Sequence, residues 1–394
     1  MYSRQVKNGV FILEGLNALA TTYYFYYIYF LMQKQFGFGA LQNLLLAAGL
    51  GFIYAFAAVF GGRVAQKRGC FFSLKIGFFI LATALLAGSQ VSHLSNHLVV
   101  MVVGTVGMCF TWPAFQAIIS ENEPRLRLQS LLGVYNLTWA GASALAYFTG
   151  GAMIEKLGLK SMFLVPGGVH FVQFIFTFWL EKKAALSSVK NNSESKIKLS
   201  PLPENKISSV QKTFLKMAWL ANPFAYLAVN TLIPVIPTLA KELNLSPQFA
   251  GFSCSVWFFA RAGSFVLLRF YPGWHYRFLG LVVSYAAMIL SFAAMLLIPN
   301  LWVLVLAQII FGLSLGLIYY SSIFYSMDVG ETKGDHAGIH EGAIGAGTCV
   351  GPAIGAAALY FFPARPHSAA WTVSGLLLTG LVGLIWLYNR KEKG

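Results

Sequence analysis

Twelve long apolar runs divide this chain, and each is close to the ~20 residues that a helix needs to cross a bilayer. The runs are mostly unbroken rather than alternating, so helices are favoured over the strands of a membrane barrel. The sequence therefore predicts an all-α integral membrane protein with twelve transmembrane helices. We expect these helices at about residues 9–32, 40–61, 71–91, 98–119, 129–154, 160–180, 214–240, 248–271, 277–298, 301–325, 337–362 and 369–389.

A polar stretch at 181–213 separates the first six runs from the last six. It is rich in lysine, serine and asparagine, and it carries Pro201 and Pro203. Such a segment cannot bury enough surface to fold by itself, so we expect a flexible connector. The predicted domains are an N-terminal six-helix bundle at 1–180, a cytoplasmic linker at 181–213 and a C-terminal six-helix bundle at 214–394.

The composition agrees with a membrane protein, because 57% of the residues are hydrophobic and only 10% are charged. The net charge of +15 comes from basic residues in short loops, which points to topology and anionic lipid rather than to nucleic acid. Most basic residues fall on one predicted side, which the positive-inside rule assigns to the cytoplasm together with both termini. The opposite loops hold only Lys34, Lys156, Lys160, Lys241 and Arg365.

The two halves also show a repeat at an offset of 205 residues. Gly133 aligns with Gly338, Asn136 with Glu341, and small residues after each pair align as well. Asn17 aligns with Asn222 at the same offset. Generic small-residue packing in lipid would give part of this pattern. Two repeated halves joined by a cytoplasmic linker indicate a transporter whose site lies between them.

One loop carries a recognisable signature. The segment from Gly62 to Gly69 has a glycine, three residues, Gln66, the bases Lys67 and Arg68, and a second glycine. It resembles the signature loop of the major facilitator superfamily, although Gln66 stands where the family has an acid. The glycines allow a tight turn, and the bases favour the cytoplasmic face.

A glycine-proline pattern in the eleventh run supports the same resemblance. Gly347, Gly351, Pro352 and Gly355 follow the spacing of a motif that the family's drug/proton antiporters carry in their fifth span. Here Tyr147 occupies the corresponding proline position in the fifth run. The chain therefore resembles the superfamily over nearly its whole length, without an assigned subfamily.

The resemblance implies two pseudo-symmetric six-helix bundles and a secondary active transporter that moves a small organic solute by alternating access, coupled to protons. Alternatives are a proton-driven efflux antiporter for lipophilic compounds and a non-transporting receptor or lipid-handling protein. In the family, spans 1, 4, 7 and 10 line the cavity. On that basis the candidate solute-binding residues are Tyr24, Tyr27, Trp112, Gln116, Asn222, Tyr226, Asn230 and Tyr320.

Glu14 is an ionisable residue inside the first run, where a charge in lipid is costly. Glu14, Asn17, Thr21 and Tyr24 share one helical stripe, which we interpret as a wall of the solute pathway. Because an apolar environment favours the neutral acid, Glu14 is a candidate proton carrier. The alternative is that it lies near the inner surface and reaches water or a loop lysine.

Glu341 and Arg261 are the other ionisable residues within predicted spans. Glu341 is either a helix-start acid favoured by the helix dipole or half of a buried polar pair across the halves, because its repeat partner Asn136 lies inside a span. Arg261, one helical turn after Trp257, either pairs with Glu14 or Glu341 or holds an anionic group of the solute. We also count Asn17, Thr21, Asn136 and Trp257 among the candidate solute-binding residues.

No pattern in the sequence supports catalysis. A phosphate-binding glycine loop with lysine and paired metal-ligating histidines are both missing, so we expect neither an enzyme nor a cofactor or metal. The four cysteines are scattered and form no disulfide pattern. We expect a monomer in a cell membrane, most simply a bacterial inner membrane.

Overall fold

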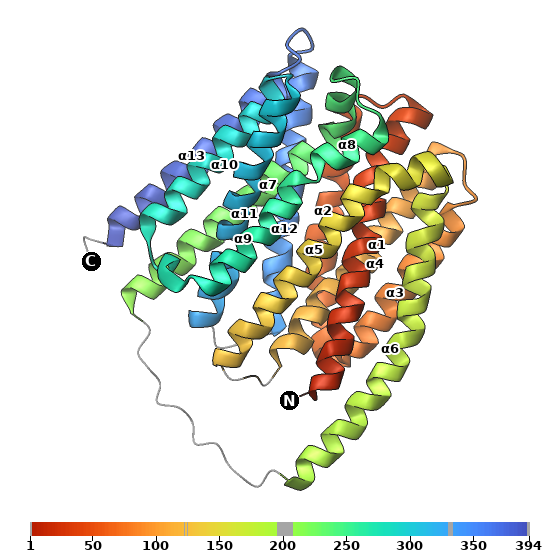
Figure 1. Ribbon diagram of the computed structural model, residues 1–394, viewed down its shortest axis with the longest axis vertical. Coiled ribbons are helices and arrows are strands. Elements are labelled where there is room, and N and C mark those ends of the chain that lie inside the picture. Colours follow the sequence, from red (N-terminus) through yellow and green to blue (C-terminus); the bar gives the residue numbers. More distant parts are fainter. Residues whose placement is uncertain (1, 122, 124, 195–207, 330–333, 392–394) are drawn as a thin grey trace.

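The computed structural model describes residues 2–121, 123, 125–194, 208–329 and 334–391, and the regular structure in these residues is helical (Figure 1). The first half contains α1 (Arg4–Phe36), α2 (Ala40–Arg68), α3 (Cys70–Gly88), α4 (Leu94–Ser120), α5 (Arg125–Leu157) and α6 (Ser161–Glu194). The second half contains α7 (Ser209–Glu242), α8 (Pro247–Cys254), α9 (Val256–Phe270), a short 3-10 helix (Pro272–Trp274), α10 (Phe278–Leu297), α11 (Leu301–Val329), α12 (Gly334–Phe361) and α13 (Ser368–Lys391).

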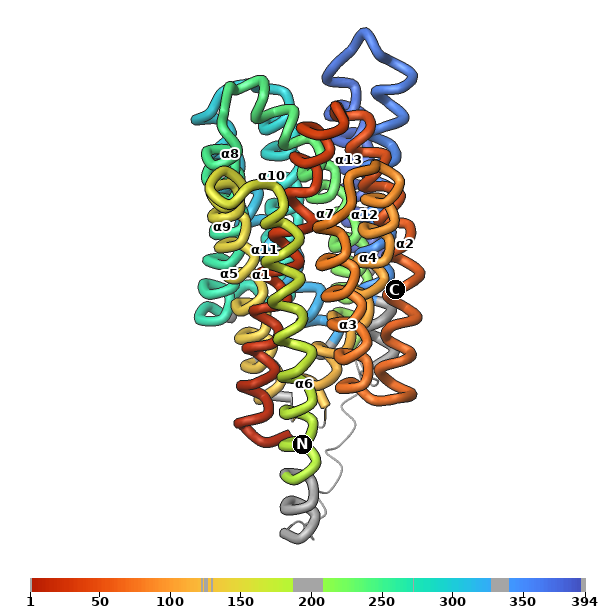
Figure 2. The backbone as a smooth tube through the Cα atoms, turned by 90° about the vertical axis from the view of Figure 1, so that its right-hand side faces the viewer, coloured from red at the N-terminus to blue at the C-terminus, as the bar shows by residue number. Residues whose placement is uncertain are grey.

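The helices run roughly along one axis, as the turned view of the backbone also shows (Figure 2). Ten stretches of the described chain are long and apolar enough to cross a membrane, and α8 with α9 form one of them. α1 and α5, of 33 residues each, are more polar. α1 keeps its polar residues out of lipid because it packs against α4, α5, α6 and α7. Each of the twelve predicted spans therefore has a helical counterpart.

Two features of the helix boundaries differ from the sequence prediction. The eighth span is broken at Ser255, whose hydroxyl donates to the Phe252 carbonyl at 2.9 Å between α8 and α9. Helix also covers both ends of the predicted connector, because α6 reaches Glu194 and α7 begins at Ser209. Ser208 caps α7 by accepting from the Gln211 backbone at 3.2 Å. Residues 195–207, the centre of the predicted connector, lie outside the described part.

The signature segment forms the last turns of α2 rather than an open loop. Gly62 is buried, whereas Gln66, Lys67 and Arg68 are exposed. Gly69 ends the helix with φ of 96°, a backbone conformation that glycine adopts without the strain of a Cβ atom. The chain therefore turns directly from α2 into α3.

Within each half, neighbouring helices pack side by side. α1 lies against α5 and α6, and α3 lies against α4 and α6. In the second half, α7 contacts α11, α12 and α13, and α9 contacts α11. The glycines of the eleventh-span motif make the contact between α12 and α7. A Cβ atom added at Gly351 would lie 2.6 Å from the Thr231 hydroxyl, so only a very small residue fits there.

The halves meet along two main seams, α2 with α12 and α5 with α8 and α9. Along the first seam a Cβ atom added at Gly345 would lie 2.6 Å from the Ala55 backbone nitrogen, which shows how closely these helices approach. Along the second, the Phe148 and Phe252 rings stack with centroids 4.5 Å apart. In Figure 1 this α5–α8 contact lies toward the upper end, opposite the N-terminus.

Candidate functional site

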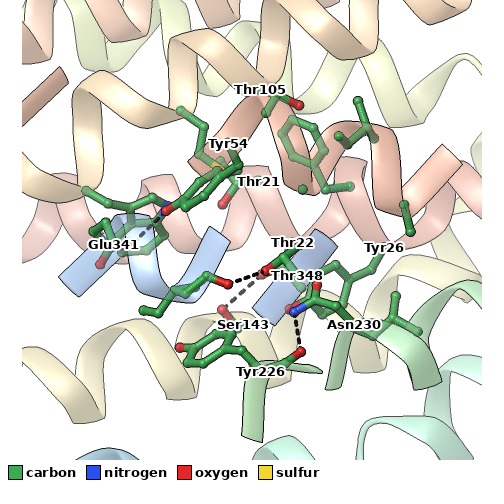
Figure 3. Close-up of a pocket in the computed structure, with 18 of the residues that line it drawn as sticks. Thr21, Thr22, Tyr26, Tyr54, Thr105, Ser143, Tyr226, Asn230, Glu341 and Thr348 are labelled. Atoms are coloured by element: carbon green, nitrogen blue, oxygen red, sulfur yellow. Dashed lines mark hydrogen bonds between the residues drawn. The ribbon is translucent and has the colours of Figure 1, made fainter. Parts of the chain in front are cut away.

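A cavity of about 190 Å³ lies between the two halves (Figure 3). Helices α1, α2, α4 and α5 of the first half and α7, α9, α11 and α12 of the second all contribute to its wall. Its lining is mainly aromatic and hydroxyl-bearing. The lining residues are Thr21, Thr22, Phe25, Tyr26, Tyr29, Ala47, Leu50, Gly51, Tyr54, Thr105, Met108, Trp112, Tyr135, Trp139, Ser143, Tyr226, Asn230, Ile233, Phe258, Tyr319, Glu341, Ile344 and Thr348.

Several polar groups of the lining are held by the protein itself. The Thr22 hydroxyl donates to Ser143 at 2.9 Å and so joins α1 to α5. The Asn230 amide donates to the Tyr226 carbonyl at 2.9 Å (Figure 3). These contacts fix the side chains and leave the amide oxygen and hydroxyls to meet a solute. The cavity therefore offers apolar rings with a few oriented polar groups, as small-molecule sites commonly do.

Glu341 reaches the cavity from α12 and is held by two neutral donors from the other half. The Tyr54 hydroxyl of α2 donates to its Oε2 at 2.6 Å (Figure 3). The Gln116 amide of α4 donates to its Oε1 at 2.6 Å. Both carboxylate oxygens are thus bonded, and the three residues link the halves. The predicted partner Asn136 instead accepts from Trp139 at 3.3 Å within α5.

Arg261 of α9 lies just behind the cavity lining, among aromatic rings, three of which belong to that lining. Its guanidinium carbon is 4.7 Å from the Trp139 ring centroid and 4.8 Å from that of Tyr319. Tyr226 and Phe265 lie slightly farther away, at 5.6 Å and 5.8 Å. Neither Glu14 nor Glu341 is within ion-pair distance, so the first of the two alternatives for Arg261, the ion pair, is not formed in this structure. Cation–π attraction partly replaces it.

Glu14 is completely buried inside the first half and does not reach the cavity lining. Within the described residues, neither of its carboxylate oxygens has a hydrogen-bond partner, and the same holds for the side-chain amide of Asn17. The alternative that Glu14 reaches a surface lysine does not apply to this conformation. An ionised carboxylate without a partner is very unfavourable in such a place.

Five of the predicted residues meet at the cavity. Thr21, Trp112, Tyr226, Asn230 and Glu341 come from four different helices and all line it. Trp112, Tyr226 and Asn230 were predicted from the spans that line the cavity in the family. Thr21 was predicted from the polar stripe of the first span, and Glu341 as an ionisable residue within a span. The structure brings them together across up to 320 positions of sequence.

Other predicted residues lie behind the wall. Tyr24 packs against Phe163 of α6, with centroids 5.4 Å apart, and Tyr27 donates to the Tyr147 carbonyl. Trp257 stacks on Phe258 at 3.8 Å, so it supports the lining from behind. The rest of this group, which the structure also keeps out of the lining, is Asn17, Gln116, Asn136, Asn222 and Tyr320.

The structure adds cavity residues that the sequence did not single out, above all Tyr54, Tyr135, Trp139 and Tyr319. Tyr54 belongs to the second span and Trp139 to the fifth, which were not among the spans chosen for the cavity. Tyr26 lies two residues from Tyr24, on another side of α1. A buried helix with aromatic residues on every side gives no periodic signal for which side faces a cavity.

No cluster of three or more histidine, cysteine or acidic side chains suited to a metal ion occurs in the described part of the chain. All four cysteines are free thiols.

Twelve membrane-crossing helices in two related bundles around a shared cavity define a polytopic membrane transporter. The chain belongs to the Major Facilitator Superfamily, whose family profile matches residues 10–221. A comparison with curated proteins finds no match.

Solved structures share the fold over nearly the whole chain. The nucleoside transporter NupG is 15% identical with a TM-score of 0.70, covering 97% of this chain and 99% of its own. The human organic anion transporter MFSD10 (TETRAN) is 14% identical with a TM-score of 0.69 and the same coverage. A bacterial homolog of the human lysosomal transporter Spinster is 14% identical, with a TM-score of 0.60, covering 97% and 95%. At these identities the likeness extends to the fold alone.

Proposed function

We propose that this transporter is a secondary active carrier that moves a small organic solute by alternating access. The observation that carries the proposal is the central cavity, because helices of both halves form its wall. A solute bound there contacts both halves at once. Rocking of one half against the other then exposes the same site first to one side of the membrane and then to the other.

The moving units in this proposal are residues 1–180 and 214–394, connected through 181–213. Movement requires the seams between them to open in turn. The α5–α8 contact at Phe148 and Phe252 is the seam that opens on one side. We assign the end that holds the N-terminus to the cytoplasm, on the evidence of the basic loop residues, and place a monomer in a bacterial inner membrane.

Thr21, Trp112, Tyr226 and Asn230 are the proposed solute contacts, since each lines the cavity. Trp112 and Tyr226 present ring surface, and Asn230 and Thr21 present polar atoms. Asn230 keeps its amide oxygen available, because the amide nitrogen already donates to Tyr226.

Glu14 is the proposed proton carrier. Its burial without a partner supports a neutral carboxylic acid in this conformation. When the halves move and water reaches α1, the proton can leave and the charge is solvated. Uptake of the proton is then linked to closure of that side, which is the coupling that proton-driven transport requires.

Glu341 has a different proposed role, as a latch between the halves. Its two hydrogen bonds, from Tyr54 and Gln116, hold α12 to α2 and α4. Bonds to an ionised group are stronger than neutral ones, so protonation of Glu341 weakens the latch. A solute or proton that disturbs this latch therefore favours separation of the halves.

The aromatic lining also fits the second candidate, a proton-driven efflux antiporter for lipophilic compounds. Tyr147 in place of the fifth-span proline speaks against it. In a non-transporting receptor with the same fold, the binding site would be accessible from one side of the membrane only. In a transporter it is accessible from both sides in turn.

Thiol labelling tests alternating access directly. A variant without the native cysteines carries one cysteine at Asn230, and a membrane-impermeant maleimide is added from either side of oriented vesicles. We expect labelling from both sides, and protection by a bound solute. A cysteine at Lys241, exposed at the end of α7 and outside the cavity lining, is the control, which a solute must not protect. Labelling of Asn230→Cys from one side only would exclude the transport cycle.

A further inference from the structure

Near the cavity, Arg261 carries hydrogen-bond donors that lack acceptors. Its side chain is buried, with only 3% of the residue exposed. The guanidinium has five N–H donors, yet within the described residues its one hydrogen bond is a long one, 3.4 Å from Nη2 to the Tyr226 hydroxyl. The Nε donor has no partner in the described part of the chain.

Glu341, the acid in the cavity lining, already has its hydrogen-bonding capacity used by the protein. Each oxygen of Glu341 already accepts a hydrogen bond at 2.6 Å, from Tyr54 and from Gln116. A cationic solute would have to compete with these bonds. The unsatisfied donors beside the cavity therefore belong to Arg261, a permanent cation, and the group that complements them is an anion.

Three of the rings around Arg261 also line the cavity, namely Trp139, Tyr226 and Tyr319. A solute that reaches Arg261 from the cavity must pass along their faces. Flat apolar groups stack well on such rings. The geometry thus joins an anion site to an aromatic surface.

We propose that the solute is an organic carboxylate with a flat, aromatic body. Its carboxylate binds the planar fork of Arg261, and its ring system lies against Trp139 and Tyr319. This inference rests on the proposed transport function and specifies its substrate class. Two parallel hydrogen bonds from the guanidinium would contribute binding free energy and would also fix the orientation of the carboxylate.

The first test uses the unmodified protein and three probes that share one body. Phenylacetate, phenylacetamide and phenethylamine are added to the purified transporter, and the melting temperature is measured. Indole-3-acetate, its amide and tryptamine form a second series with a larger ring. Because a ligand of the folded state raises its melting temperature, we expect the carboxylates to raise it and the amides and amines to leave it unchanged. Stabilisation by the amines but not the carboxylates would overturn the inference.

Variants of Arg261 separate binding from structural support. Arg261→Gln should weaken carboxylate binding by roughly tenfold or more, because charge-assisted hydrogen bonds are lost. Arg261→Lys keeps the charge but loses the fork, and an intermediate affinity is expected. Arg365→Gln, in the exposed loop after α12, is the matched control and should bind as the wild type does. Unchanged carboxylate affinity in Arg261→Gln would mean that Arg261 only supports the aromatic cluster.

A counterflow assay in proteoliposomes tests carboxylate binding at Arg261 and the proposed transport function separately. Exchange of labelled indole-3-acetate supports both. Carboxylate binding without any exchange retains the anion site and contradicts transport. Exchange of tryptamine without exchange of the carboxylate retains transport and contradicts the anion site.

Discussion

The Tyr54 hydroxyl on α2 donates a 2.6 Å hydrogen bond to Glu341 on α12, across 287 positions of sequence and between the two halves of the transporter. The bond lies at the cavity wall, where Gln116 of α4 binds the other carboxylate oxygen. One side chain of the second half is thus held by two helices of the first. A movement of the halves that separates α12 from α2 and α4 must break these bonds.

The first prediction concerns this latch. Tyr54→Phe removes one donor to a carboxylate, and we expect a loss of about 1–3 kcal/mol in the free energy of unfolding. Gln116→Leu should behave similarly, and the double variant should lose less than the sum, because both act on Glu341. Thermal unfolding in detergent gives the values. Tyr29→Phe is the control, since no hydrogen bond of its hydroxyl is found in the described part. Strict additivity would contradict a shared role.

The second prediction concerns the buried charges near the start of α1. Lys7 and Glu123 form an ion pair whose side chains are 3% and 0% exposed, and Arg127 lies 3.3 Å from the same carboxylate. Lys7→Met should destabilise the protein by about 3–5 kcal/mol, because it leaves buried charge poorly compensated. Adding Glu123→Gln should restore part of the loss.

A surface pair supplies the comparison. Lys75 contacts Glu181 at 2.9 Å, and that glutamate side chain is 40% exposed. Lys75→Met should therefore cost only about 0–1 kcal/mol. Equal effects of Lys7→Met and Lys75→Met on the melting temperature would show that burial does not set the strength of the first pair.

The third prediction concerns the close seam of α2 and α12. Gly345→Leu would force side-chain atoms into the Ala55 backbone, and we expect a loss of about 1–3 kcal/mol or more. Ala346→Leu adds the same volume on the exposed face of α12 and should be tolerated. The yield of monodisperse protein and its melting temperature report both changes. A tolerant Gly345 would mean that the seam is looser than the structure indicates.

The fourth prediction concerns Glu14. Glu14→Gln cannot release a proton, so uptake driven by a pH gradient should be lost while solute exchange continues. Glu242→Gln changes an exposed acid at the end of α7 and should keep both activities. Proteoliposomes with and without an imposed gradient separate the two readouts. Gradient-driven uptake at the wild-type rate in Glu14→Gln would exclude Glu14 as the proton carrier.

The sequence predicts the helices well, because length and hydropathy alone decide whether a segment can cross lipid. The break at Ser255 was not predicted, since the eighth span contains no proline or other strong helix breaker there. Orientation around a helix axis was also hard to predict. Thr21 lines the cavity, but Tyr24 of the same predicted stripe turns toward α6. Hydropathy can show which face of a helix meets lipid and which meets protein. It does not show whether a protein-facing side chain lines a cavity or packs inside a bundle.

The partners of the buried charges could not be predicted either. Glu341 was recognised as important, but its donors Tyr54 and Gln116 lie 287 and 225 positions away. For Arg261 the sequence suggested an acid, and the structure surrounds it with rings instead. Tyrosine and tryptophan are so frequent in this chain that nothing marks the few that gather around one cation. Such choices depend on how the two halves dock.

The central claim is that the halves move against each other around the cavity, and a reversible cross-link tests it most directly. Phe148→Cys and Phe252→Cys place thiols on α5 and α8, where the native rings stack at 4.5 Å. The assay joins them with a short bis-methanethiosulfonate reagent in a cysteine-free background. A cross-linked pair at Phe79 and Phe174, within the first half, is the control. We predict that the α5–α8 cross-link stops solute uptake and that reduction restores it. Full uptake by the cross-linked protein would contradict the account.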